Sequence, residues 1–255
     1  MNLKNKVVVV TGGASGLGLV TCQKLAKQGA KIVAFDLNEK AGHALVDELK
    51  GQAIFAKVDV TDVSSVEAGI ALAVETFGTI HVCISCAGIA PGGKTVGRNG
   101  ALALEKFIQV ISINLIGTFN VLRLAAEQMA KNEPEDDGER GVIINTASVA
   151  AFDGQMGQAA YSASKAGVAG MTLPIARDLA KLGIRVMTIA PGIFDTPMMK
   201  QMSDAVREPL IQMVQSPKRF GNPEEYASLA VHIINNSYLN GEVIRLDGAI
   251  RMESK

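Results

Sequence analysis

The sequence predicts an α/β fold: one doubly wound parallel sheet of about seven strands with helices on both faces. Short apolar runs rich in Val and Ile alternate with longer stretches of helical periodicity, which is typical of βαβ units. The runs are almost uninterrupted, as expected for strands that are covered on both faces. No Pro-, Gly- or Ser-rich linker divides the chain, so we expect a single domain over residues 1–255.

The individual elements follow from these patterns in chain order. Each predicted strand is a short apolar run, and the runs are Lys6–Val10, Lys31–Phe35, Ala53–Val58, His81–Ser85, Val142–Thr146, Arg185–Ala190 and Val243–Leu246. Each predicted helix has apolar residues at helical spacing, and the ranges are Gly18–Gln28, Glu39–Leu49, Val63–Phe77, Leu104–Lys131, Tyr161–Leu182 and Glu224–Ile234. Parallel strands joined by helices require right-handed crossovers.

Composition argues against several classes of protein. Lys and Arg total 25, as do Asp and Glu, so the net charge is zero and we expect no nucleic-acid partner. No uninterrupted apolar run approaches the roughly 18 residues of a membrane span, so we expect no membrane association. Three cysteines, an odd number, indicate a reducing compartment, and we expect a cytoplasmic location. The histidines are scattered without ligand spacing, so we expect no metal.

A loop of small residues joins the first predicted strand to the first predicted helix. It runs Thr11-Gly-Gly-Ala-Ser-Gly-Leu-Gly18, and small residues let a backbone turn sharply and approach a pyrophosphate. The helix that follows supplies free N–H groups and the positive end of a dipole. Glycines also make ordinary turns, which is the alternative. The cofactor contacts that we expect from this loop are Gly12, Ser15, Gly16, Leu17 and Gly18.

Asp36 ends the second predicted strand, 18 residues after Gly18. A carboxylate there can accept hydrogen bonds from the adenosine ribose and would repel a 2′-phosphate, which favours NAD over NADP. An Asp that caps the next helix is the alternative. Asp59 and Val60 follow the third strand, where they could contact the adenine or form a plain turn.

Three polar residues in the second half of the chain could transfer a proton. Ser148 follows the fifth predicted strand, at the sheet edge where such folds bind ligands. Tyr161 and Lys165 are four residues apart, so a helix places them on one face. A nearby ammonium and a positive nicotinamide ring would lower the phenol pKa, so that Tyr161 could take a proton from a substrate hydroxyl. Ser148 could hold the substrate oxygen, and Lys165 could also bind the nicotinamide ribose.

Together these motifs resemble the short-chain dehydrogenase/reductase family over essentially the whole chain. The resemblance rests on the glycine loop, Ser148, Tyr161-Ser-Ala-Ser-Lys165 and Pro191-Gly192. It implies a Rossmann-type, NAD-dependent oxidoreductase whose catalytic residues are Ser148, Tyr161, Lys165 and Asn114. It also implies cofactor contacts from Ala87, Gly88, Pro191, Gly192 and Thr196. One departure is Ser85-Cys86-Ala87-Gly88, where the family usually has Asn-Asn-Ala-Gly.

A narrower resemblance is to the type II 3-hydroxyacyl-CoA dehydrogenase branch, also called type 10 17β-hydroxysteroid dehydrogenase. It rests on the segments Gly141–Phe152, Gly154–Tyr161, Met171–Leu179 and Asn240–Met252. It implies NAD-linked oxidation of the 3-hydroxyl of short or branched acyl-CoA substrates, Gln155 at the substrate site, and a homotetramer. The nearest alternatives are a 3-oxoacyl-carrier-protein reductase and a hydroxysteroid or other alcohol dehydrogenase. A cofactor-bound scaffold with secondary catalysis is an alternative of another class.

Three segments lie outside the strand–helix pattern. Residues 90–106 are Gly-rich and carry Lys94 and Arg98, which could meet CoA phosphates or lie in a solvated loop. Residues 132–141 carry five acidic side chains and are expected to be a solvated loop. Residues 191–217 could be a lid over an acyl chain or pack ordinarily, and the methionines there are Met198, Met199, Met202 and Met213.

Overall fold

The main sheet confirms the predicted fold class. The computed structural model describes residues 1–200 and 204–254. Seven parallel strands pair in the order β3-β2-β1-β4-β7-β8-β9. Their bounds are Val7–Thr11 (β1), Lys31–Asp36 (β2), Ala53–Lys57 (β3), Val82–Ser85 (β4), Gly141–Thr146 (β7), Ile184–Pro191 (β8) and Val243–Leu246 (β9). The order reverses between β1 and β4, and ligands bind outside the carboxyl ends of strands at such a switch point.

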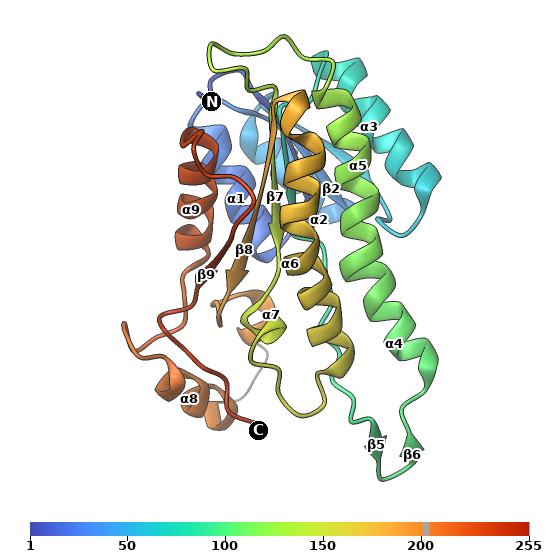
Figure 1. The fold of residues 1–255 in the computed structure, drawn as a ribbon, viewed down its shortest axis with the longest axis vertical. Helices are drawn as coiled ribbons and strands as arrows, with labels where there is room; N and C mark the ends of the chain where they lie inside the picture. The colour runs from blue at the N-terminus through green and yellow to red at the C-terminus, as the bar shows by residue number, and fades with distance from the viewer. Residues whose placement is uncertain (201–203, 255) are drawn as a thin grey trace.

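Helices cover both faces of this sheet (Figure 1). One face carries α1 (Gly16–Lys27), α2 (Glu39–Leu49) and α9 (Pro223–Asn235). The other carries α3 (Val63–Phe77), α5 (Gly117–Met129) and α6 (Ala159–Leu179). Alternate residues of β1 enter the two cores, with Val8 and Val10 on the first face and Val7 and Val9 on the second. Burial on both sides explains why the strands are predominantly apolar.

The helical stretch predicted over Leu104–Lys131 consists of three joined segments. They are α4 (Leu104–Ile111), a π-helical turn (Ser112–Ile116) and α5. By length and composition, the 26-residue stretch Leu104–Met129, which contains an 18-residue window with a mean hydropathy of 1.5, could cross a membrane. The expectation that no segment is long and apolar enough to span a membrane considered only uninterrupted apolar runs, and it therefore missed this helical stretch. In this fold the stretch packs against β4, α3 and α6.

Two segments outside the predicted pattern contain regular structure. Residues 90–106 include an antiparallel hairpin of β5 (Val96–Gly97) and β6 (Gly100–Ala101). Residues 191–217 include α7 (Pro197–Lys200) and α8 (Asp204–Met213). The hairpin strands are exposed and have two residues each, which is too short for periodicity to reveal them.

The acidic segment 132–141 is not solvated throughout. Glu139 is buried, and its carboxylate lies 2.7 Å from Nε of Arg185 in β8. Arg185 also donates hydrogen bonds to the carbonyl oxygens of Leu239 and Ile234. The prediction of a solvated loop was wrong at Glu139, because a cation on a buried strand requires a paired anion.

Candidate active site

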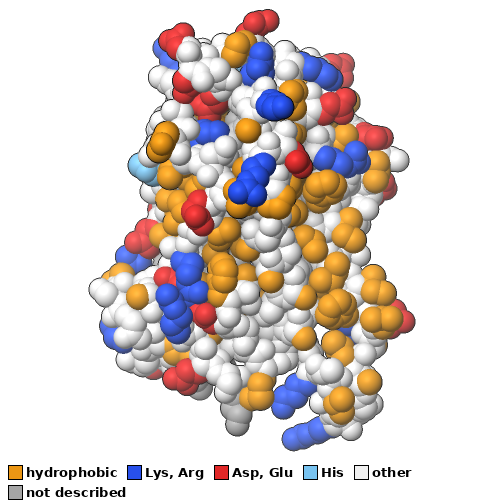
Figure 2. All heavy atoms as spheres, viewed as in Figure 1, with side chains coloured by type: hydrophobic (Ala, Val, Ile, Leu, Met, Phe, Trp, Pro, Cys, Tyr) orange, Lys and Arg blue, Asp and Glu red, His pale blue; other side chains and the backbone are white. Residues whose placement is uncertain are grey.

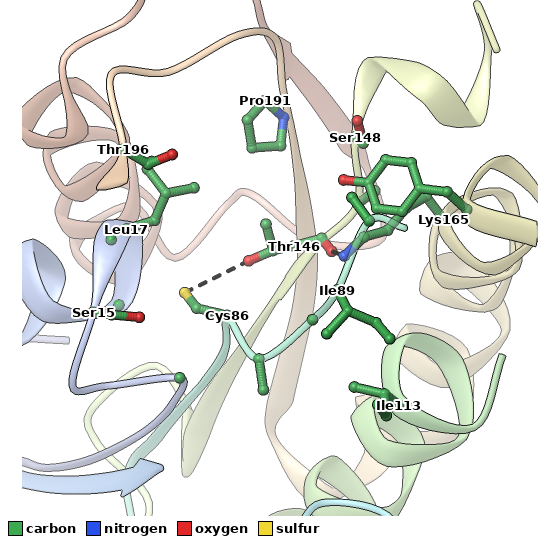
Figure 3. Close-up of a pocket in the computed structure, with 18 of the residues that line it drawn as sticks. Ser15, Leu17, Cys86, Ile89, Ile113, Thr146, Ser148, Lys165, Pro191 and Thr196 are labelled. Atoms are coloured by element: carbon green, nitrogen blue, oxygen red, sulfur yellow. Dashed lines mark hydrogen bonds between the residues drawn. The ribbon is translucent and has the colours of Figure 1, made fainter. Parts of the chain in front are cut away.

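A cavity of about 900 Å³ opens at the carboxyl ends of β1, β4, β7 and β8. Ser15, Leu17 and Thr196 lie on one side of it, and Ser148 and Lys165 lie on the other (Figure 3). Asn114 is fully buried and does not line the cavity. The Met198 side chain and all of Met202 lie outside the described residues. The predicted site residues that do line it are Gly12, Ser15, Gly16, Leu17, Gly18, Asp36, Asp59, Val60, Ala87, Gly88, Ser148, Gln155, Tyr161, Lys165, Pro191, Gly192, Thr196 and Met199.

The glycine loop has the shape that a dinucleotide requires. Gly16 has a φ of +51°, and among the described residues only Thr196 comes within 4 Å of the position that a Cβ would occupy there. A Cβ on Gly18 would lie 2.2 Å from the Gly12 carbonyl oxygen, so the loop and the first turn of α1 are in direct backbone contact. Because Ser15 makes no side-chain cap hydrogen bond, it leaves this helix start open toward the cavity. N–H groups in a first turn lack intrahelical partners, which suits a pyrophosphate.

The two predicted nucleotide-contacting carboxylates occupy the ends of β2 and β3. Asp36 accepts hydrogen bonds from the backbone N–H groups of Ala14 and Asn38, both at 3.0 Å. Asp36 therefore braces the glycine loop as well as lining the cavity. The alternative that it caps the next helix was wrong, because the N-cap of α2 is Asn38, whose side chain accepts the Ala41 N–H. Asp59 accepts the Thr61 N–H at 2.9 Å. Within the described part of the chain, no three His, Cys, Asp or Glu side chains are grouped to hold a metal ion.

The hydroxyl groups of Ser148 and Tyr161 lie close enough to interact. Ser148 precedes a 3₁₀ turn, Val149–Ala151, and its Oγ accepts the Ala150 N–H at 3.1 Å. Tyr161 lies in the first turn of α6. Burial raises the pKa of Tyr161, and a hydrogen bond with the Ser148 hydroxyl opposes that rise. This differs from the expectation of a lowered pKa, because desolvation of the phenol outweighs the hydrogen bond in the protein alone.

Lys165 is buried one turn beyond Tyr161 on the same helix face. Its Nζ donates to the Thr146 carbonyl oxygen at 2.7 Å and lies 5.9 Å from the centroid of the Tyr161 ring. Burial lowers the pKa of Lys165 to about 8. The ammonium is therefore fixed between the end of β7 and the phenol, where it can act on both Tyr161 and a bound ribose.

Asn114 holds the backbone of Ile89, a residue that lines the cavity. Asn114 lies in the π-helical turn, where the backbone departs from α-helical geometry. Its Oδ1 accepts the Ile89 N–H at 2.8 Å, and its Nδ2 donates to the Ile89 carbonyl at 2.9 Å. Nδ2 also donates to Ser164 Oγ at 3.1 Å, which joins this turn to α6 beside Lys165.

Two threonines that the sequence interpretation missed stabilise the floor of the site. Thr11 Oγ1 accepts the N–H groups of Cys86 and Ala87, both at 3.1 Å, and so braces the segment that lacks the family's usual asparagines. Thr146 positions Lys165 through its carbonyl, and its hydroxyl contacts Cys86 (Figure 3). The same hydroxyl also contacts the Tyr226 hydroxyl. The available signal was position, since both threonines end apolar strands at the carboxyl edge of the sheet.

Comparison with known proteins decides the family. The family model described as short chain dehydrogenase matches residues 6–207. The chain belongs to this family. It is 56% identical to 3-hydroxyacyl-CoA dehydrogenase type-2 of Bos taurus over 254 residues, covering 99% of this chain and 97% of the relative. The Drosophila melanogaster protein of the same name is 54% identical, with 98% and 99% covered.

A solved structure agrees with this assignment. The crystal structure of 3-hydroxyacyl-CoA dehydrogenase type-2 from Mycobacterium avium matches with a TM-score of 0.95 at 41% identity, and 98% of each chain is covered. Family membership makes the protein an oxidoreductase and implies a nicotinamide dinucleotide cofactor.

The pKa of Lys165 predicts a pH dependence of cofactor binding. The ammonium is charged below about pH 8 and loses its charge above it. A charged hydrogen bond contributes about 1.5–3 kcal/mol, so we expect the Kd for NADH to rise about tenfold as pH increases through that value. NADH fluorescence titrations across pH measure this. In Lys165→Gln, which is neutral at every pH, the Kd for NADH should no longer depend on pH. A wild-type Kd that does not change with pH would contradict a contact between the Lys165 ammonium and the cofactor.

Proposed function

We propose that this protein is an NAD-dependent 3-hydroxyacyl-CoA dehydrogenase acting on short or branched acyl chains. The observation that carries the proposal is that Ser148, Tyr161 and Lys165 lie together on the wall of the cavity that the glycine loop also lines. Figure 3 shows Ser148 and Lys165 on the side opposite Ser15 and Leu17. The names of relatives at 54% and 56% identity support an acyl-CoA substrate rather than a carrier-protein-linked or steroid substrate.

Proton transfer at the Tyr161 hydroxyl is the step that the chain supplies. The bound dinucleotide supplies a hydride acceptor for oxidation and a hydride donor for reduction. Ser148 Oγ hydrogen-bonds the substrate oxygen and orients it toward Tyr161. During oxidation the Tyr161 phenolate takes the hydroxyl proton, and during reduction the phenol returns it. Since burial raises the pKa of Tyr161, the nearby Lys165 ammonium has the role of favouring the phenolate.

Asp36 is the basis for proposing NAD over NADP. Its carboxylate lines the cavity at the end of β2, where a 2′-phosphate would meet a like charge. We expect Asp36→Asn to raise the ratio of kcat/KM with NADPH to that with NADH by about tenfold or more. Asp59→Asn is the matched control, because Asp59 lines the same cavity at the end of the next strand, and it should leave the ratio unchanged. Equal ratios in the Asp36 variant and the wild type would remove the argument for NAD.

The hairpin region is the proposed contact for the CoA portion. Ile89 and Ala90 line the cavity, and the Gly93 N–H donates to the Gly157 carbonyl at 2.8 Å, beside the loop that carries Gln155. Lys94 and Arg98 are exposed on this region. Figure 2 shows basic side chains gathered over the hairpin. Cations there can meet the phosphates of CoA while the acyl end enters the cavity.

A comparison of three substrates tests the proposed function. The protein would be mixed with NADH and acetoacetyl-CoA, acetoacetyl-carrier protein or a ketosteroid, and NADH absorbance would be followed. We expect rapid loss of NADH with the CoA ester and slow loss with the other two. Preference for the carrier-protein substrate would favour a biosynthetic reductase, and turnover of the steroid alone would remove the acyl-CoA assignment.

An assembly of identical subunits is part of the proposal. The joined helices α4 and α5 expose large apolar side chains, and α6 exposes another beside them; these are Leu104, Ile108, Ile116, Phe119 and Leu173. Figure 2 shows apolar side chains along this flank. We propose that a second copy, rather than a membrane, covers them within a homotetramer. A cytoplasmic location also stays a proposal, consistent with three free thiols.

A further inference from the structure

The chain reverses after β9 and returns to the cavity. In the turn from Asp247 to Ile250, the Ile250 N–H donates to the Asp247 carbonyl at 3.1 Å. The central residues Gly248 and Ala249 have φ values of +58° and +60°, and positive φ at both positions is typical of a type I′ turn. An alanine rarely adopts this conformation, so the surrounding contacts must hold it there. Residues 250–254, here called the return segment, then run toward α8 (Figure 1).

The return segment forms part of the cavity wall next to Ser148. The Met156 N–H donates to the Ser254 carbonyl at 3.0 Å, and the Gln155 side-chain amide donates to the Glu253 carbonyl at 3.2 Å. These bonds join it to the loop between Ser148 and α6. Met252 itself lines the cavity, and it packs against a small apolar cluster that includes Val149, the residue after Ser148.

One arginine holds this arrangement together. Arg245 in β9 places one guanidinium nitrogen 2.5 Å from Asp153 Oδ2 and its Nε 2.8 Å from Asp247 Oδ2. The same guanidinium donates to the Ile250 carbonyl at 3.1 Å. Its planar fork thus ties β9, the turn and the loop after Ser148 to one another, a geometry that Lys cannot reproduce.

The surroundings of Met252 indicate which part of a substrate would meet it. The cluster against which Met252 packs is apolar and consists of Val149, Val214 and Ile250, with Ile193 and Met213 also packed on it. The exposed cations Lys94 and Arg98 lie in the hairpin region instead. An acyl tail suits the first environment and CoA phosphates suit the second.

We propose that Met252 limits the size of the acyl group that the cavity accepts, and that Arg245 is a positioning residue that holds Met252 there. This inference rests on the proposed acyl-CoA substrate. Truncating Met252 opens space at the apolar end without changing Ser148, Tyr161 or Lys165. The acyl-length preference should therefore change while the chemical step is preserved.

The test is the ratio of kcat/KM for 3-oxooctanoyl-CoA to that for acetoacetyl-CoA. We expect Met252→Ala to raise this ratio about tenfold, as hydrophobic pockets discriminate by roughly that factor per methylene. Met213→Ala is the matched control, because Met213 belongs to the same apolar cluster but does not line the cavity. It should lower stability comparably and leave the ratio unchanged. An unchanged ratio in Met252→Ala, or an equal change in Met213→Ala, overturns the proposal.

Arg245 is tested by separating KM from kcat. We expect Arg245→Gln to raise the KM for acetoacetyl-CoA, to leave kcat close to wild type and to shift the ratio as Met252→Ala does. Asp153→Asn removes the negative partner of Arg245 and should shift the ratio in the same direction. Arg245→Lys keeps the positive charge and should shift the ratio less than Arg245→Gln does. Loss of thermal stability without any shift in the ratio would overturn the positioning role. If the wild-type protein uses neither CoA ester, the proposed function fails and this inference fails with it, whereas wild-type activity with an unchanged ratio rejects the inference alone.

Discussion

Tyr161→Phe is expected to lower kcat for acetoacetyl-CoA reduction by about 10²–10⁴-fold, because it removes the proton donor and leaves the ring in place. The Kd for NADH should change little, since Lys165 remains fixed to the Thr146 carbonyl. Stopped-flow measurement of NADH oxidation and fluorescence titration of NADH measure the two quantities separately.

Tyr238→Phe is the matched control for this prediction. The substitution removes the same hydroxyl, but the Tyr238 side chain is 98% exposed. Its kcat should equal that of the wild type. A Tyr161→Phe variant that keeps near-wild-type kcat would show that another group transfers the proton.

Gly18→Ala is expected to weaken NADH binding by about 100-fold. The added Cβ would lie 2.2 Å from the Gly12 carbonyl oxygen, so the backbone of the loop must shift. The backbone of Gly12 packs closely against that of Ala87, since even the position of an added Cβ on Gly12 would lie 3.0 Å from the Ala87 nitrogen. Little space is therefore left for Gly12 to move. A displacement of about an ångström would remove the N–H groups of α1 from the cofactor phosphates. Fluorescence titration measures the Kd.

Gly170→Ala provides the control for the glycine prediction. Gly170 is also a helical glycine, but nothing lies within 4 Å of its added Cβ. This variant should bind NADH with the wild-type Kd, because the added methyl group meets no other atom of the described residues. It should also unfold at a slightly higher temperature, because Ala in a helix interior is more stable than Gly by about 0.5–1 kcal/mol. Normal NADH binding by Gly18→Ala would mean that the loop tolerates the shift and does not form the phosphate site.

The positions of the glycine loop, Asp36, Ser148 and the Tyr161–Lys165 pair could be predicted from the sequence. Each depends on local pattern: strands buried on both faces are predominantly apolar, their carboxyl ends meet at one edge, and a four-residue spacing selects one helix face. Residues that follow such strands must therefore gather at one cavity, whatever the details of packing.

Features that depend on distant contacts could not be predicted in this way. The pairing of buried Glu139 with Arg185 joins a loop to a strand 46 residues away. The pKa of Tyr161 reflects how deeply the phenol is buried, which spacing does not reveal. Met252 reaches the cavity because of the turn at Gly248 and Ala249. The Asp247-Gly248 dipeptide indicates a turn, but it does not indicate that the residues after the turn line the cavity.

Hydride transfer to carbon 3 of an acyl-CoA is the central claim, and deuterium labelling tests it most directly. Acetoacetyl-CoA would be reduced with NADH that carries two deuterium atoms at the reactive carbon of the nicotinamide, so that either hydrogen transferred is labelled, and the product would be analysed by mass spectrometry. We predict 3-hydroxybutyryl-CoA with one deuterium on carbon 3. Consumption of NADH without that product, or a product without the label, would contradict the account.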